Sequence, residues 1–327
     1  MGHVFVSREL PGRAVALLRD AGHEVVVWPG ELPPEAAVLR EHLLGADGVL
    51  TMVTDPIGGE LIEAASRLRI IANMAVGYDN IDQEAAAAAG VWATNTPGVL
   101  HDTTADLTFA LMLAAARNVV VSDRDTRAGG WRTWSPTAFL GHDPSGATLG
   151  IVGLGEIGQA VARRGRGFGM TILTSTRTAR PELERELGVQ RVSLAELLER
   201  SDFVSLHVPL GPETEALIGP AELALMKSTA ILVNTARGGV VDQDALVEAL
   251  GTAAIGGAAL DVTVPEPLPV DHPLLGFDNV IITPHIGSAS HATRARMAEM
   301  AAENIIAVLA GDEPNHPVNR PPHPRPA

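Results

Sequence analysis

Three polar residues follow apolar runs in the second half of the chain. Arg237 lies in VNTARGGVVD, Glu266 in LDVTVPEPLP and His285 in ITPHIGSAS. A guanidinium donates paired hydrogen bonds to a carboxylate, and an imidazole exchanges a proton near neutral pH, most effectively when a carboxylate orients it. Ligands of open α/β sheets bind at the carboxyl ends of strands, where each of these runs ends. Any one residue could be structural, but the set predicts acid–base chemistry on a small anion.

A glycine motif begins the region that contains these residues. Residues 149–164 read LGIVGLGEIGQAVARR. This run predicts an apolar strand, a Gly-x-Gly-x-x-Gly turn and a helix that starts at about Glu156. Glycines there admit a pyrophosphate, and the helix N-terminus favours negative charge. The alternative is a structural turn, since the chain has 33 glycines. We predict a dinucleotide whose contacts include Gly153, Gly155, Glu156, Ile157 and Gly158.

The segment after the next predicted strand bears on the kind of dinucleotide. An NAD enzyme places an acid about 20 residues beyond the glycines to bind the ribose 2′-hydroxyl. The local run here is TSTRTAR, which contains no acid. Hydroxyls and guanidinium groups suit a 2′-phosphate, so the sequence predicts a preference for NADP(H), with NAD(H) possible. A solvated basic loop is the alternative. The residues concerned are Ser175, Thr176, Arg177 and Thr178, with Arg180 beyond them.

The order of elements predicts two α/β domains. Short β-rich runs alternate with amphipathic helices from the N-terminus, and about five strands fit in residues 1–98. A second series, with six strands expected, occupies 99–285, and the final helix is expected to return to the first domain. Residues 104–121 read as one helix that is apolar on all sides and so buried, in the core or a subunit interface. The proline-rich tail is expected to be disordered at its end.

Composition excludes several classes of function. The formal net charge of −15 opposes binding to nucleic acid or anionic membranes. No apolar run approaches the ~20 residues of a membrane span, and no export signal is recognised, so a cytoplasmic location is expected. The chain has no cysteine, which rules out disulfides and thiolate metal sites. His285 and His291 lack the spacing of metal ligands on a helix, so we expect no metal.

Several motifs in order resemble one enzyme family. They are NMAVGYDNID, TNTPGVLHDTTADLTFALMLAAAR, GIVGLGEIGQAVARR and HVPLGPET, together with the three segments that hold Arg237, Glu266 and His285. Over nearly its whole length the chain is similar to D-isomer-specific 2-hydroxyacid dehydrogenases. Within that family, DVTVPEPLPVDHPLL and PHIGSASHATRARM most resemble glyoxylate/hydroxypyruvate reductases.

The resemblance implies two Rossmann-like or flavodoxin-like domains with parallel sheets and an active site in the interdomain cleft. The substrate-binding domain would be discontinuous, residues 1–98 plus 286–327, and residues 99–285 would form the dinucleotide-binding domain of a homodimer. The implied activity is reduction of small 2-oxo acids, glyoxylate and hydroxypyruvate, to (D-)2-hydroxy acids by a nicotinamide cofactor, NADPH in preference.

The family's residue roles carry over to matching positions. Arg237 would bind the substrate carboxylate and ketone oxygen, His285 would donate the proton, and Glu266 would bond the other ring nitrogen and favour the protonated ring. The backbone amides of Val76 and Gly77 would also hold the carboxylate. The further cofactor contacts implied are Thr104, His207, Pro209, Thr235, Ala236, Asp261 and Gly287, with Arg237 and His285 themselves.

Two departures and three alternatives accompany this interpretation. His101 stands where the family often has a small polar residue, and an aromatic often found near Ala138 is absent, so Phe139 or Trp134 would have to substitute. Phosphoglycerate dehydrogenase is an alternative within the family, but it usually carries an acid after the second cofactor strand, where this sequence has none. Formate dehydrogenase is a second alternative, but it has glutamine at the position of Glu266. A non-catalytic scaffold that senses NAD(P)H, like the C-terminal-binding-protein corepressors, stays open.

Overall fold

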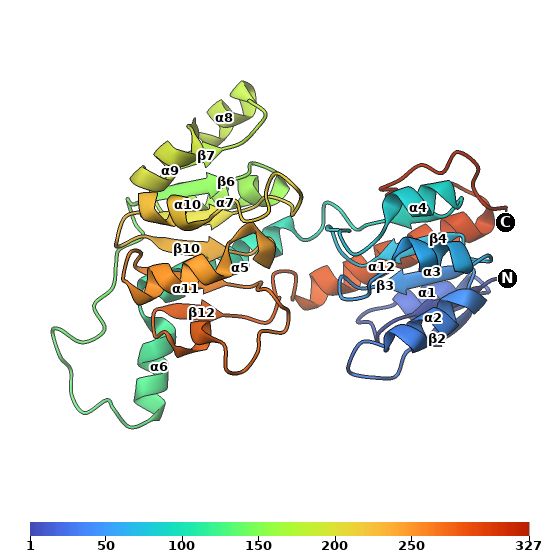
Figure 1. The fold of residues 1–327 in the computed structure, drawn as a ribbon, viewed down its shortest axis with the longest axis horizontal. Coiled ribbons are helices and arrows are strands. Elements are labelled where there is room, and N and C mark those ends of the chain that lie inside the picture. Colours follow the sequence, from blue (N-terminus) through green and yellow to red (C-terminus); the bar gives the residue numbers. More distant parts are fainter. Residues whose placement is uncertain (327) are drawn as a thin grey trace. The chain divides into compact units, whose positions relative to one another are not determined.

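The computed structural model describes residues 1–326, which form two compact units. Unit 1 comprises Met1–Leu100 together with the chain from Ala289 onward, and unit 2 comprises His101–Ser288. Each unit is built on one parallel sheet, of five strands in unit 1 and seven in unit 2 (Figure 1). The predicted α/β class with two parallel sheets is confirmed.

Unit 1 has the strand order β2-β1-β3-β4-β5, which is the flavodoxin-like order. Strands β3 and β4 are buried along their whole length because helices cover both faces of the sheet. Five strands are what the sequence predicts here. Their bounds are β1 His3–Val6, β2 Glu24–Val27, β3 Gly48–Thr51, β4 Ile70–Asn73 and β5 Trp92–Thr94, and the helices between them are α1 Ala14–Asp20, α2 Ala36–Gly45, α3 Gly59–Ala64 and α4 Gln83–Ala88.

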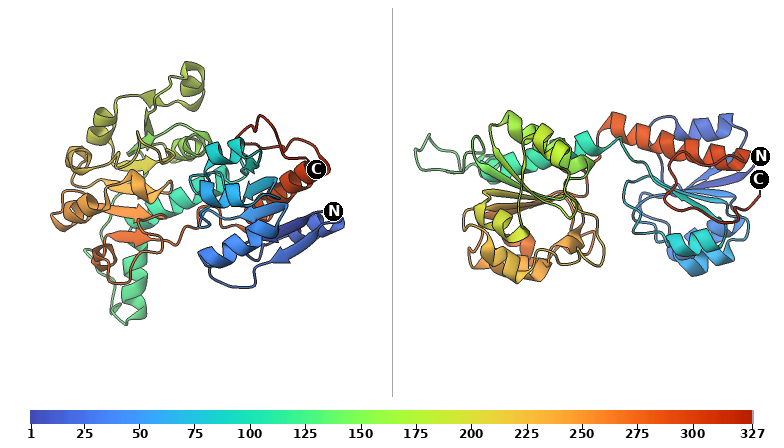
Figure 2. Two further views of the ribbon diagram at one scale, coloured as in Figure 1. Left: turned by 45° about the vertical axis from the view of Figure 1, so that its right-hand side comes forward. Right: turned by 90° about the horizontal axis from the view of Figure 1, so that it is seen from above.

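The last helix, α12 (His291–Ala310), packs on the sheet of unit 1, as the sequence predicts. Ala298, Ala301 and Ile305 join the apolar cluster on the sheet face that α1 also covers. The helix lies along the sheet in Figure 2. Its small alanine side chains allow this close packing. Ser290 caps its start by accepting a bond from the Thr293 amide at 3.1 Å.

The proline-rich tail is ordered against unit 1, so the expectation of disorder at its end is wrong as far as residue 326; Ala327 lies outside the described residues. The Val318 amide donates to the Ala93 carbonyl at 2.8 Å, and the Asn319 side chain accepts the Ala93 amide at 2.8 Å and donates to the Val91 carbonyl at 2.9 Å. Nearer the end, the Arg325 amide donates to Gly90 at 3.0 Å. The edge strand β5 has unpaired backbone groups, and the tail satisfies them in a way that composition does not indicate.

Unit 2 has the strand order β12-β11-β10-β9-β6-β7-β8, and every pair is parallel. The sequence predicts six strands; the two-residue strand β8 was missed because it is exposed and short. The order of strands reverses between β6 and β9, which is where open sheets bind ligands. The strands are β6 Thr148–Val152, β7 Thr171–Ser175, β8 Gln190–Arg191, β9 Phe203–Leu206, β10 Ile231–Asn234, β11 Gly257–Leu260 and β12 Val280–Ile282.

Helices cover both faces of this second sheet. Side chains of α5, α7 and α8 pack in one apolar cluster, and those of α9, α10 and α11 pack in the other. The helices are α5 His101–Ala116, α6 Val119–Arg127, α7 Glu156–Gly167, α8 Pro181–Leu187, α9 Leu194–Arg200, α10 Pro220–Leu225 and α11 Gln243–Gly251, with short 3₁₀ turns η1 Gly238–Val240 and η2 Pro273–Gly276.

The single buried helix predicted over 104–121 is two helices. Asn118 has φ of 53°, and α5 and α6 bend by 64° at this point. Asparagine tolerates the left-handed region, and its side-chain amide donates to the Leu140 carbonyl at 2.9 Å. Beyond the bend Val119 is 51% exposed, so only α5 is a core helix. Within residues 1–326 no single helix is long and apolar enough to cross a membrane. The bent α5–α6 pair meets the requirements for a membrane span only in its length and composition.

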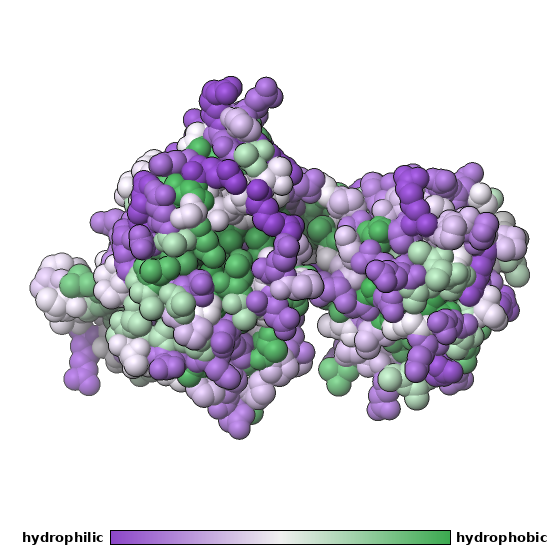
Figure 3. All heavy atoms as spheres, turned by 45° about the horizontal axis from the view of Figure 1, so that its top comes forward, coloured by the Kyte–Doolittle hydropathy of each residue, from purple (hydrophilic) through white to green (hydrophobic). Residues whose placement is uncertain are grey.

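An arm of residues 128–147 follows α6 and extends from the body of unit 2 in both sets of ribbon views (Figures 1 and 2). It carries exposed aromatic and aliphatic side chains: Trp131 and Trp134 are 72% and 79% exposed, and Leu140 is 72% exposed. Apolar green atoms appear on this projecting segment in Figure 3. Several large apolar side chains exposed together on one segment are characteristic of an interaction surface.

Candidate active site

The glycine turn joins β6 to α7 at the switch point of the second sheet. A Cβ on Gly153 would lie 2.5 Å from the His207 carbonyl oxygen, and one on Gly158 would lie 2.1 Å from the Gly153 oxygen. Both glycines are therefore required by packing. A Cβ on Gly155 would meet nothing within 4 Å, so backbone is exposed there at the start of α7. No side chain caps this twelve-residue helix, and its first amides can meet an anion.

The loop after β7 holds the residues expected to select the cofactor. Ser175 and Thr176 are half-buried, whereas Arg177 and Thr178 are exposed. Arg191 orders the loop by donating to the Thr176 carbonyl at 3.2 Å. The loop is not purely basic, because Arg177 forms an ion pair with Glu213 of the β9–α10 connection. The sequence reasoning missed Glu213, which lies in the quoted HVPLGPET motif but far along the chain from Arg177.

His207 follows β9, next to the glycine turn. Burial lowers its pKa to about 3, so the ring is neutral. Its Nε2 atom lies 2.7 Å from the Ser205 hydroxyl. Its Nδ1 atom is buried and has no hydrogen-bond partner within residues 1–326. A buried nitrogen without a partner is unfavourable, and a ligand hydroxyl would satisfy it. The chain's own residues therefore fit a dinucleotide at this position.

Asp261 fastens the loop that carries His285. Its carboxylate is almost wholly buried and accepts bonds from the Thr283 hydroxyl at 2.6 Å and from the Ile286 and Gly287 amides at 2.8 and 2.7 Å. A Cβ on Gly287 would lie 3.2 Å from this carboxylate. The sequence reasoning treated Asp261 as a cofactor contact and missed these loop bonds, which no local pattern indicates.

The imidazole of His285 is held from both its backbone and its ring. The backbone has φ of 53°, in the left-handed region, and the amide donates to the Asp261 carbonyl at 2.9 Å. The ring nitrogen Nδ1 lies 3.0 Å from Oε2 of Glu266. The other carboxylate oxygen, Oε1, accepts the Thr263 amide at 3.2 Å. A non-glycine residue in this conformation costs energy, which is common at functional sites.

The charge state of Glu266 follows from this environment. Burial alone would raise its pKa, but the hydrogen bond and charge of His285, the Thr263 amide and the charge of Arg237 together outweigh burial. The pKa of Glu266 therefore lies below its ordinary value, and the carboxylate is ionised at neutral pH. An ionised carboxylate only accepts, so Nδ1 of His285 carries the hydrogen between them.

Arg237 lies just beyond β10, on a backbone fixed by Asn234. The buried Asn234 side chain donates to the Arg237 carbonyl at 2.8 Å and accepts the Ala236 amide at 3.0 Å. Arg237 itself donates to the Ala236 carbonyl at 2.8 Å. Asn234 is a positioning residue that the sequence reasoning missed, although it stands in the quoted VNTARGG segment.

The remaining predicted contacts of unit 2 lie at or near strand ends. Thr104 and Thr235 are buried, and both bond Thr108: its hydroxyl donates to the Thr104 carbonyl at 2.8 Å and lies 3.0 Å from the Thr235 hydroxyl. Pro209 is exposed and its carbonyl accepts from Thr214 at 2.6 Å. Glu156 is exposed and Ile157 half-buried in the first turn of α7.

Three further observations concern residues outside this set. His101 Nε2 lies 3.4 Å from Asp102, and its buried Nδ1 has no partner within residues 1–326. Ala138 and Phe139 are on the exposed arm with Trp134. In the described part of the chain, no three His, Asp or Glu side chains are grouped to hold a metal.

Val76 and Gly77 belong to unit 1 and follow β4. The Gly77 carbonyl accepts from Asn73 at 2.9 Å and the Val76 carbonyl from Asn95 at 2.8 Å, so the loop's oxygens are taken up by asparagine amides. Neither backbone N–H has an acceptor among the described residues. This loop therefore presents donors, as an anion-binding turn does.

Comparison with known proteins agrees with this geometry. Residues 109–287 match the family model for the D-isomer specific 2-hydroxyacid dehydrogenase, NAD binding domain. A glyoxylate reductase of Korarchaeum cryptofilum is 54% identical over 318 residues, covering 97% of this chain and 96% of that protein. A crystal structure of a Thermus thermophilus protein superposes with a TM-score of 0.92 at 50% identity, covering 97% and 99% of the two chains.

An NADPH-dependent glyoxylate/hydroxypyruvate reductase from Sinorhizobium meliloti, solved with citrate, has a TM-score of 0.85 at 32% identity and covers 99% of this chain and 100% of its own. The first relatives thus match nearly end to end, in sequence and in structure. The chain belongs to the D-isomer specific 2-hydroxyacid dehydrogenase family.

Proposed function

We propose that this enzyme is a reductase of small 2-oxo acids, with glyoxylate and hydroxypyruvate as substrates and NADPH as the preferred cofactor. The observation that carries the proposal is the bond between ionised Glu266 and Nδ1 of His285, at the end of a strand, within the electrostatic reach of Arg237. The names of the similar proteins, glyoxylate reductase and NADPH-dependent glyoxylate/hydroxypyruvate reductase, support the choice of substrate.

In this proposal unit 2 holds the cofactor, and unit 1, Met1–Leu100 with the chain from Ala289 onward, is the substrate-binding domain that the sequence predicts at residues 1–98 plus 286–327. A bound nicotinamide would supply the hydride. The chain's own groups bind and orient it: the open backbone at Gly155 and the amides of α7 meet the pyrophosphate, and His207 Nδ1 accepts a hydroxyl. Thr104, Thr235, Asp261 and Gly287 complete the surroundings.

Substrate binding and proton transfer are assigned to separate groups. The guanidinium of Arg237 donates to the carboxylate and ketone oxygens of the 2-oxo acid, and the amides of Val76 and Gly77 also hold the carboxylate. His285 gives its Nε2 proton to the ketone oxygen, which becomes the hydroxyl. The ring keeps its Nδ1 hydrogen, which Glu266 accepts, and so is left neutral.

Replacing His285 by alanine tests the proposed function. We expect kcat for glyoxylate reduction to fall by about 100-fold or more, since general acid catalysis contributes at least that much. NADPH binding should hardly change, measured by fluorescence titration. The exposed His291→Ala variant is the control. A wild-type protein that binds NADPH and turns over no 2-oxo acid would instead support the scaffold alternative.

The Glu266→Gln variant should change the dependence of reduction on pH. The pKa of Glu266 is depressed, so in the native enzyme its negative charge persists as the pH falls into the ordinary range for glutamate, about 4.3. Removing this charge leaves the protonated ring without its stabilising partner. At pH values above the ordinary pKa of glutamate, where the native carboxylate is charged, kcat/KM of the variant should therefore fall below that of the native enzyme, and the shape of its pH profile should change. An unchanged profile would show that Glu266 does not assist proton transfer.

Cofactor preference should respond in opposite directions to changes in the Arg177–Glu213 pair. Arg177→Ala should weaken NADPH binding about tenfold and leave NADH nearly unaffected, because a charge-assisted bond to phosphate is lost. Glu213→Gln should tighten NADPH binding by up to about fivefold, since an exposed ion pair contributes about 1 kcal/mol at most. Arg185→Ala on α8 is the matched control. Equal effects on both cofactors would contradict the assignment.

We also propose a homodimer in which the exposed arm of unit 2 contacts a second copy. Trp131 and Trp134 expose large apolar areas that a partner would cover. Trp134→Arg should shift the enzyme from dimer to monomer in light scattering after size-exclusion chromatography. The exposed Leu32→Arg in unit 1 should leave the dimer intact. A wild-type monomer, or a dimer that survives Trp134→Arg, would refute the proposal.

A further inference from the structure

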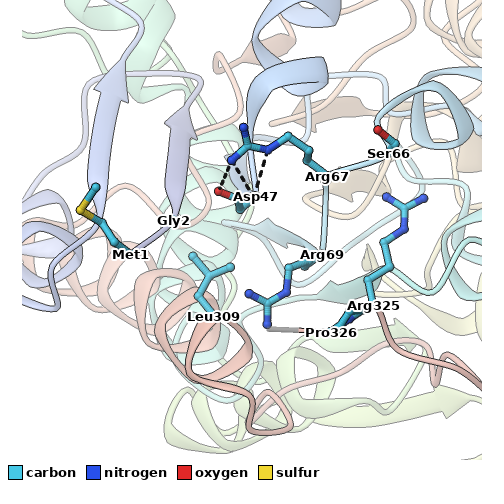
Figure 4. A pocket seen from close by; sticks show the side chains of 9 residues that line it. All are labelled: Met1, Gly2, Asp47, Ser66, Arg67, Arg69, Leu309, Arg325 and Pro326. Carbon is cyan, nitrogen blue, oxygen red and sulfur yellow. Dashed lines mark hydrogen bonds and ion pairs between the residues drawn. The ribbon is translucent and has the colours of Figure 1, made fainter.

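A cavity of about 480 Å³ opens at the amino ends of strands β1, β3 and β4 of unit 1. It is lined by residues that precede these strands, Gly2, Asp47 and Arg69, and by Arg67, Leu309 and Arg325 (Figure 4). Val76 and Gly77 follow the opposite, carboxyl end of β4. The cavity is therefore separate from the loop proposed to bind the substrate, and none of the roles above uses it.

Positive charge predominates around this cavity. Among the described residues that line it, three carry guanidinium groups and one carries a side-chain carboxylate, in a chain whose formal net charge is −15. Asp47 is bound by Arg67, at 3.0 Å between Nη2 and Oδ2, and it also accepts the His3 amide at 2.7 Å. Its negative charge is thus already shared. Arginines clustered against the overall charge of a protein create a local field that attracts anions.

The other two arginines form no ion pair with a side-chain carboxylate of residues 1–326 and are held by backbone carbonyls. Arg69 donates to the Val308 carbonyl at 2.5 Å, near the end of α12, and Arg325 donates to Ala65 and Leu68 at 2.5 and 2.7 Å. Burial lowers the pKa of both guanidinium groups. The Nε of Arg69 is buried and has no acceptor within residues 1–326. Backbone carbonyls fix both cations, and the charge of Asp47 also acts on Arg69.

We propose that this cavity is a binding site for a compact polyanion, a small molecule that carries phosphate or several carboxylate groups. Guanidinium groups match both chemistries with paired hydrogen bonds. The volume lies within the range of small-molecule sites and exceeds what a single inorganic anion fills, so the natural ligand has a body beyond its charged group.

Inorganic phosphate and citrate are the probes, measured by calorimetric titration of the full chain at constant ionic strength. Both could also bind the proposed active site, so the titrations use an Arg177→Ala/Arg237→Ala background that removes those two anion contacts. In this background, Arg67→Gln should weaken binding about tenfold, the effect of losing one charge-assisted bond. Asp47→Asn should strengthen it, because it removes the one acidic side chain among the described residues that line the cavity. The exposed Arg40→Gln on α2 is the control.

Opposite effects of Arg67→Gln and Asp47→Asn would establish the site, since a merely structural disturbance would weaken binding in both. Tighter binding of phosphate or of citrate would then say which chemistry is recognised. No binding of either anion at millimolar concentration, or binding that Arg67→Gln leaves unchanged, would overturn the proposal. Arg69 is left intact because its bond to α12 stabilises the fold.

Discussion

The hydrogen bond between Glu266 and His285 is the contact on which the proposed chemistry depends. It joins two side chains from segments that follow different strands, β11 and β12, and it holds the ring in one orientation. The carboxylate is ionised because His285, Thr263 and Arg237 together outweigh the cost of its partial burial. His285 has a left-handed backbone, and the buried Asp261 holds it through its carbonyl and through bonds to the following loop.

The parallel sheet makes this convergence possible. Strands β10, β11 and β12 are neighbours, so residues that follow them at positions 237, 266 and 285 reach the same edge of one sheet. At the switch point of that sheet, the glycine turn and His207 lie against each other, and the glycines there are required by close backbone contacts. The order of the strands therefore determines which groups lie near one another. Hydrogen bonds that Asn234 and Asp261 form with the loops then fix the orientation of Arg237 and His285.

Much of the fold and of the candidate site was predictable from sequence, and the features that were not predicted share a physical cause. Alternating apolar runs predicted both sheets, and the glycine motif predicted the start of α7, because those signals are local. The return of α12 was predicted from its place in the chain, after the second sheet is complete. Glu213, Asn234 and the loop bonds of Asp261 were missed because each acts through a tertiary contact that leaves no periodic pattern. The break at Asn118 and the order of the tail were mispredicted for a related reason: side-chain and backbone bonds to distant residues outweighed composition.

The charge distribution gives the two proposed anion sites a common basis. An acidic chain repels acids at long range, so binding them requires arginines placed in local settings, and Lys227 is the only lysine available. In unit 2 Arg237 is set on a backbone fixed by Asn234, and in unit 1 Arg69 and Arg325 are set by backbone carbonyls. In each case bonds to backbone carbonyls or to a backbone-fixing amide help to orient the arginine.

The hydrogen positions on His285 test the central claim most directly. Nitrogen NMR of the histidine-labelled enzyme, taken at a pH where the ring is neutral, distinguishes the two tautomers, with His285→Ala identifying the signal. The account predicts that the hydrogen remains on Nδ1, facing Glu266, so that Nε2 is the nitrogen that has given up its proton. A neutral ring with its hydrogen on Nε2 would contradict it.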